Sequence, residues 1–144
     1  MTLAHELQHY VQYHGTPEVR AANTVVSRQL RSETVEKLGL DWHSIPIERQ
    51  ARIVAKRVSQ ELLGEEATEA HIDRMESEHH SPGDATDWAK TRLIDTSQPY
   101  DITTETQHLF ARLGEVRPEL EAALDRLRGD PDFEHLSLDP FFAT

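Results

Sequence analysis

Apolar side chains recur along this chain at the spacing of helices, and no strand-like alternation persists beyond a few residues. The first expected helix covers residues 2–13, where the apolar positions gather on one side if successive residues turn by about 100°. These positions are Leu3, Leu7, Tyr10 and Val11. Gly15 is expected to end the helix, because glycine favours helix C-termini.

Two further helices are expected before residue 64. Pro17 can start one over residues 17–38, and Gly39 is expected to end it. The other covers residues 47–63 and has the clearest pattern, with apolar side chains at the i, i+3, i+4 spacing. These side chains are Ala51, Val54, Ala55, Val58 and Leu62.

The middle of the chain, residues 65–103, is expected to be a polar and partly ordered connection. Residues 65–80 are polar almost all round, so the pattern assigns them no buried face. Residues 81–84 read Ser-Pro-Gly-Asp, which indicates a turn. A short helix over residues 86–94 is expected to follow.

The carboxy-terminal part, residues 104–144, again has helical patterns. Helices are expected over residues 104–113 and 118–127, and Thr104 with Gln107 has the spacing of a capping box at the start of the first. The chain ends in an apolar tail with Leu138, Phe141 and Phe142, which is expected to dock onto another surface.

These patterns predict a mainly α fold. A chain of 144 residues is long enough for one domain with a modest core. Within that domain, the expected parts are a helical segment over residues 1–64, the connection over 65–103 and the carboxy-terminal helices over 104–144.

Composition limits the classes of partner and site. Asp and Glu number 26 against 15 Lys and Arg, and the formal net charge of −11 disfavours nucleic acids and anionic membranes as partners. The chain has no Cys, so any metal must be held by His and carboxylate side chains. No apolar run approaches the roughly 20 residues of a membrane span, and the start lacks a signal-peptide pattern. The expectation is a soluble, cytoplasmic protein.

The string His5-Glu6-Leu7-Gln8-His9 carries the strongest chemical signal. It places two imidazoles one helical turn apart on one face, which lets both reach the same metal ion. The His and Glu content of the chain gives this pattern about 0.06 times by chance. The apolar stripe lies on the opposite side, so the helix is expected to have one core face and one metal-binding face. The competing interpretation is a solvated helix whose His side chains face water.

A peptidase-type zinc site needs a third protein ligand, and Glu48 is the preferred candidate. It falls at the start of the stripe of the 47–63 helix that is expected to be buried, and a buried carboxylate needs a cation or hydrogen-bond donors. Its place in the first turn also has a simple explanation, since the helix dipole favours a negative charge there. His43 is a weaker alternative, because it lies in an expected loop.

His5-Glu6-x-x-His9, followed 39 residues later by Glu48, resembles the gluzincin branch of the zincin metallopeptidases. The resemblance covers roughly residues 2–64. It implies Zn²⁺ as cofactor, His5, His9 and Glu48 as metal ligands, and a peptide or protein as substrate. It also implies that Glu6 is the catalytic base, which takes a proton from a zinc-activated water and passes it to the leaving amine. The metzincin branch is excluded, because position 15 is Gly rather than His.

Zincins normally have a β-sheet before the active-site helix, whereas here that helix begins almost at Met1. Without the sheet, the stripe with Leu3 and Leu7 must be buried by the carboxy-terminal helices, by a partner chain or by self-association. The alternative function is therefore a helical interaction or regulatory module with a structural or vestigial metal site. The candidates for an oxyanion stabiliser rest on proximity in sequence alone: Tyr13, His14 and His43.

A second group of possible metal ligands lies in the polar middle of the chain: His71, Asp73, Glu76, His79 and His80. Glu76 and His80 have the spacing of one helical face, but a solvated acidic helix explains the group better. The tryptophans Trp42 and Trp88 are expected to anchor the core rather than to line a site.

Overall fold

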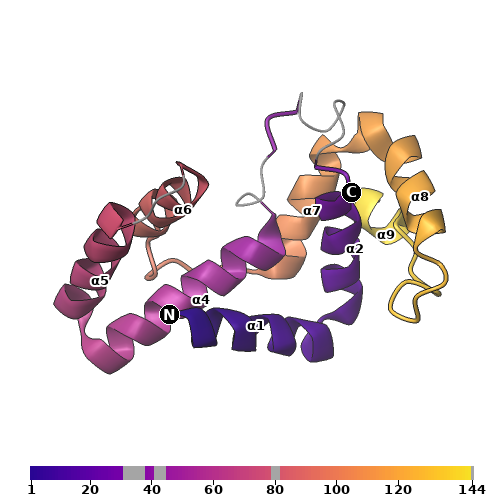
Figure 1. The fold of residues 1–144 in the computed structure, drawn as a ribbon. Helices are drawn as coiled ribbons and strands as arrows, with labels where there is room; N and C mark the ends of the chain where they lie inside the picture. Colours follow the sequence, from indigo (N-terminus) through magenta and orange to yellow (C-terminus); the bar gives the residue numbers. More distant parts are fainter. Residues whose placement is uncertain (31–37, 41–44, 79–81, 144) are drawn as a thin grey trace. The chain divides into compact units, whose positions relative to one another are not determined.

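The computed structural model describes residues 1–30, 38–40, 45–78 and 82–143. Over these residues the chain is mainly helical and has no strand, which confirms the expected fold class. Figure 1 shows the elements, which follow one another in this order: α1 (Thr2–Gly15), α2 (Pro17–Arg28), α4 (Pro46–Leu63), α5 (Glu65–Glu78), α6 (Pro82–Arg92), α7 (Ile102–Arg112), the 3₁₀ turn η2 (Gly114–Val116), α8 (Arg117–Arg126) and α9 (Asp139–Phe142). None of the described helices combines the length and the apolar character needed to cross a bilayer.

The chain divides into two compact units, each built from two separate stretches. The first unit comprises Met1–His9 and Gln50–Pro99, and the second comprises Tyr10–Arg49 and Tyr100–Thr144. The division passes through α1 and α4, so each of these helices contributes to both units. The expected three-part division of the sequence stays a prediction.

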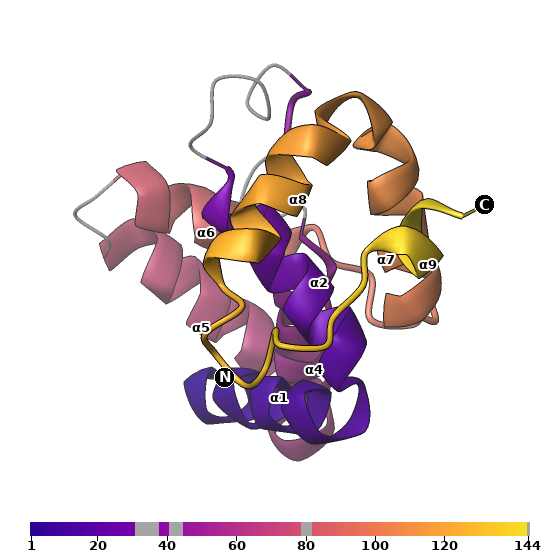
Figure 2. The same ribbon diagram turned by 90° about the vertical axis from the view of Figure 1, so that its right-hand side faces the viewer.

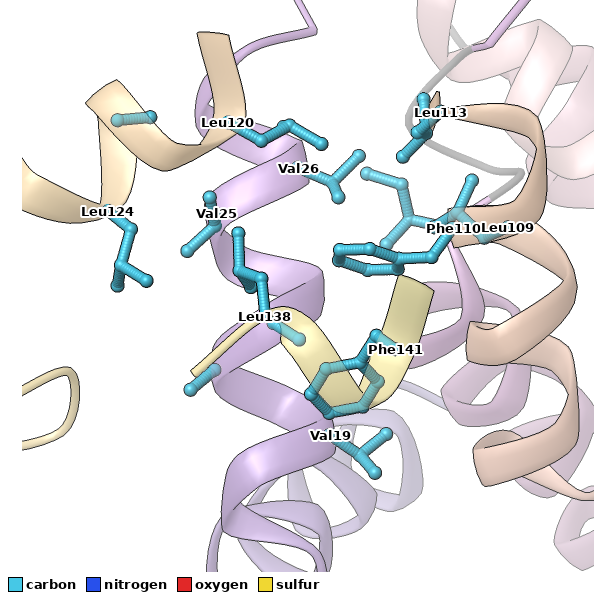
Figure 3. Packing of buried hydrophobic residues seen from close by; sticks show 14 of the residues in the cluster. Val19, Val25, Val26, Leu109, Phe110, Leu113, Leu120, Leu124, Leu138 and Phe141 are labelled. Carbon is cyan, nitrogen blue, oxygen red and sulfur yellow. The ribbon is translucent and has the colours of Figure 1, made fainter. Parts of the chain in front are cut away.

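The second unit holds the main apolar core. Side chains from α2, α7, α8 and α9 point toward one another in this unit, as Figure 3 shows. Phe110 of α7 is fully buried, and its ring centroid lies 5.3 Å from that of Phe141 in α9. Burial of such side chains is the main stabilising contribution to a helical unit. The apolar tail docks as expected, with Leu138 and Phe141 buried.

Polar contacts join the helices of the first unit. Helices α5 and α6 lie side by side in Figures 1 and 2, and Arg92 of α6 pairs with the carboxylates of Asp73 and Glu76 of α5. Lys56 of α4 is only 2% exposed, and its ammonium donates hydrogen bonds to three carbonyl oxygens at and beyond the end of α6. A cation is favourable there because the carbonyls at a helix C-terminus have no partners within the helix.

Helix α2 is shorter than its pattern predicted, since it ends at Arg28 rather than near residue 38. The Gln29 amide donates to the Val26 carbonyl, which tightens the last turn. The hydroxyl of Ser27 donates to a backbone carbonyl one turn back, and such local bonds compete with helix continuation. Residues 31–37, which belong to the same expected helix, lie outside the described residues.

Two helix starts also differ from expectation. Helix α6 begins at Pro82, so residues 82–84 are helical instead of forming a turn, as suits a proline with no amide hydrogen. The carboxylate of Asp101 caps α7 by accepting from the amides of Thr103 and Thr104. The expected capping box at Thr104 is therefore wrong, because Asp101 already satisfies the first free amides.

The apolar stripe of α1 is exposed, contrary to the expectation of a core face on that side. Leu3 is 73% exposed, and Leu7, Tyr10 and Val11 are each more than half exposed. The opposite side of the helix is the covered one, with Gln12 buried and His5 half-buried. Leu62, which was expected in the buried stripe of α4, is also exposed.

Candidate metal centre

Helix α1 brings the two His side chains of the motif together in the first unit. The Nε2 atoms of His5 and His9 are 3.2 Å apart, and the ring planes are nearly perpendicular, at 79°. Both residues are half-buried. The contact follows from the sequence spacing, because residues four apart lie on the same helix face.

Glu6 lies between the two His residues in sequence and lines a pocket beside them. The pocket has a volume of about 210 Å³ and belongs wholly to the first unit, with walls from α1, α4 and α6. His5 of α1 and Arg52 of α4 line it together with Glu6. Glu6 therefore borders a space that a small group can enter beside His5.

Glu48 lies in the first turn of α4 and is 7% exposed. Its neighbour Ile47 accepts a hydrogen bond, 2.9 Å long, from the side-chain amide of Gln12 in α1. Gln8 of α1 also donates to the side chain of Gln50 in α4, at 3.1 Å. These two contacts join α1 to α4 at residues on either side of Glu48. Amide hydrogen bonds therefore hold the first turn of α4 against α1.

His5, His9 and Glu48 form a group that could hold a metal ion. One donor atom from each lies within 4.8 Å of the other two. Within the part of the chain that the structure describes, no other group of three or more His and carboxylate side chains meets this spacing. Two imidazole nitrogens and a carboxylate oxygen suit zinc and other first-row transition metals.

The other expected candidates are placed elsewhere. Asp73 and Glu76 of the second cluster pair with Arg92, and His79 and His80 lie outside the described residues, as does His43. The Tyr13 hydroxyl donates to the Asp132 carboxylate at 2.8 Å, and this hydrogen bond raises the Tyr13 pKa. A tyrosine engaged in this way is a poor choice of oxyanion stabiliser.

Three residues that sequence reasoning left out also bear on this site: Arg52, Asp87 and Trp88. They lie more than 40 residues after the His pair, yet they line the pocket that contains Glu6. Trp88 was expected in the core, but it is half-buried at the pocket wall. No periodic pattern could have revealed this, because α6 has a weak apolar face and its pairing with α4 is a tertiary contact.

Comparison of this chain with protein-family models, with curated proteins and with solved structures gave no match. The metal-binding geometry must therefore be judged on its own chemistry.

Proposed function

We propose that this chain is a zinc-dependent peptidase in which His5, His9 and Glu48 hold the metal and Glu6 is the general base. The observation that carries the proposal is the close approach of the two imidazole nitrogens in the motif, with a buried carboxylate near them.

The His pair fits the dimensions of a zinc site. Two nitrogens bound to zinc at about 2.05 Å and at the tetrahedral angle are about 3.3 Å apart, and the Nε2 atoms of His5 and His9 are 3.2 Å apart. The same separation suits an N–H···N hydrogen bond between the two rings. Ligands that are held this close together would need little rearrangement to bind a metal, which reduces the cost of ordering them.

Glu48 would complete the ligand set with one carboxylate oxygen. The three donor atoms lie within 4.8 Å of one another, so a single metal ion could reach all three. A peptidase-type zinc keeps its fourth position for water. Three protein ligands of this kind are consistent with that requirement.

Bound zinc would lower the pKa of a coordinated water and polarise the peptide carbonyl. Glu6 would act as the general base and acid: its carboxylate accepts a proton from the attacking water and delivers it to the leaving amine nitrogen. Its place in the pocket beside His5 supports this role, because a general base must reach both the water and the substrate.

Zinc content of the purified protein, measured by elemental analysis after dialysis, tests the proposal. We expect about one zinc per chain in the wild type and a loss of bound zinc in His9→Ala and Glu48→Ala. His14→Ala is the matched control, since His14 lies on the same helix but is exposed, and it should retain the metal. A wild-type protein without zinc after exposure to the metal would overturn the proposal.

The exposed stripe of α1 favours a second candidate, a helical interaction module. Leu3, Leu7, Tyr10 and Val11 present four large apolar side chains on one exposed helix face. A contiguous patch of this kind is typical of a surface that another chain covers. If this candidate is right, light scattering of the wild type should show an associated species, and Leu7→Glu should abolish it. The peptidase proposal alone predicts the same molar mass for the wild type and Leu7→Glu.

A further inference from the structure

The pocket beside His5 and Glu6 has the dimensions of a single side chain. Its volume of about 210 Å³ is below the range of about 300 to 1,000 Å³ that is usual for sites of whole small-molecule ligands. It lies in one compact unit, and α1, α4 and α6 all contribute to its wall. A peptide bound at the metal centre could therefore place one residue in it.

Part of the pocket wall is apolar. Ala55 of α4 is 3% exposed, and the indole of Trp88 in α6 contributes the largest flat surface. The imidazole of His71 meets the Trp88 ring edge to face, with centroids 5.7 Å apart and planes at 85°. This contact helps to hold the indole in one orientation, and a rigid aromatic wall binds apolar groups at little entropic cost.

Arg52 also lines the pocket, and its guanidinium contacts α6. One guanidinium nitrogen, Nη1, donates to the Asp87 carbonyl at 3.3 Å, and Nη2 lies 3.6 Å from the Asp87 carboxylate. Nη1 also lies 3.5 Å from the Thr91 hydroxyl. Arg52 thus ties α4 to α6 at Asp87, the residue just before Trp88, which makes it a positioning residue for the indole.

We infer that this pocket selects peptides with an aliphatic or aromatic side chain, such as leucine or phenylalanine, next to the scissile bond. Trp88 is the specificity-determining residue, and the Arg52–Asp87 pair positions it. The inference rests on the proposed function, because it takes the scissile bond to lie at the His5 and Glu6 end of the pocket.

Peptides that differ only at this residue test the specificity. We expect leucine and phenylalanine peptides to have a higher kcat/KM than alanine peptides by about 10- to 100-fold, as hydrophobic pockets usually discriminate. Trp88→Ala should remove most of that preference while the zinc content stays near the wild-type value. Leu93→Ala is the control, because Leu93 directly follows α6 and is 81% exposed. An equal loss for all peptides in Trp88→Ala would overturn the inference.

A binding measurement separates this inference from the proposed function. The indole N–H signal of Trp88 in nuclear magnetic resonance reports occupancy without zinc or turnover, and Trp88→Phe assigns it. We expect millimolar N-acetylphenylalanine amide to shift this signal and N-acetylalanine amide to leave it unchanged. If the protein binds zinc and cleaves peptides but the signal does not move, the side-chain pocket is wrong. If the signal moves in a protein that binds no zinc, the peptidase proposal fails and the apolar side-chain site remains.

Discussion

The side-chain amide of Gln12 donates to the backbone carbonyl of Ile47 across 2.9 Å, and Gln12 is only 2% exposed. This hydrogen bond joins α1 to α4 at the residue before Glu48. The sequence pattern placed the packed face of α1 on its apolar stripe, whereas the packed face carries the polar side chains His5, His9 and Gln12. Polar contacts therefore determine how α1, which carries His5 and His9, packs against α4, which carries Glu48.

Gln12→Ala should destabilise the protein by about 1 to 3 kcal/mol, because it leaves the Ile47 carbonyl without this donor in a buried position. It should also weaken zinc binding, since the register that holds Glu48 near the imidazoles is loosened. Urea unfolding and a competition titration with a zinc chelator measure the two effects. Gln107→Ala is the control, because Gln107 is exposed on α7, and it should change neither the stability nor the zinc affinity. If Gln12→Ala and Gln107→Ala have similar effects, Gln12 does not hold α1 on α4.

Glu6→Gln separates metal binding from catalysis. The amide cannot accept a proton, so hydrolysis should fall by about 10²- to 10⁴-fold, the usual contribution of a positioned general base. Zinc content should remain that of the wild type, because Glu6 is not among the three proposed ligands. Peptide cleavage and elemental analysis on the same preparation give the result. Full activity in Glu6→Gln would exclude the proposed mechanism even if zinc is bound.

Lys56→Met tests the polar core of the first unit. The ammonium lies within 3.0 Å of the carbonyl oxygens of Thr91, Arg92 and Ile94, and methionine would leave all three without this donor. We expect a loss of about 2 to 4 kcal/mol in the free energy of unfolding, as for other buried networks that lose their charged partner. Glu61→Met, on the exposed side of α4, should change stability by less than about 0.5 kcal/mol. Urea denaturation of both variants provides the comparison.

Much of the helical framework could be predicted from periodicity and from Gly and Pro positions. Helix α4 was predicted to within one residue at its start, because alanines and β-branched residues mark its buried side. Helix α5 was not, since it buries only Thr68 and Ile72 along 14 residues, and its carboxylates pair with Arg92 of α6. Local pattern cannot reveal an element that is held by contacts with a distant helix.

The candidate site was predictable in part for a similar reason. The His5 and His9 pairing follows from a spacing of four residues within one helix. The burial of Glu48 was expected from its alignment with Ala51 and agrees with the structure. The pocket wall was not predictable from the sequence. It depends on the contact between Arg52 of α4 and Asp87 of α6, which are 35 residues apart in sequence.

The lowered pKa of His71 is expected to reduce the stability of the fold as the pH falls. Its pKa is lowered from the usual value of 6.5, first by partial burial and then by the positive charge of Arg74. The unfolded chain therefore binds a proton more readily than the folded chain. Stability that is present above pH 6.5 is lost as the pH falls from there toward the lowered pKa of the folded state.

The variant His71→Gln removes the titrating ring but keeps a polar side chain beside Trp88. We expect the wild type to lose more stability than His71→Gln when the pH is lowered from 7.5 to 5.5, because only the wild type has to protonate this imidazole on unfolding. Urea denaturation at the two pH values measures the difference. His108→Gln is the control, since His108 lies exposed on α7 in the other unit. If His71→Gln shows the same pH dependence as the wild type, the lowered pKa of His71 does not contribute to the acid sensitivity of the fold.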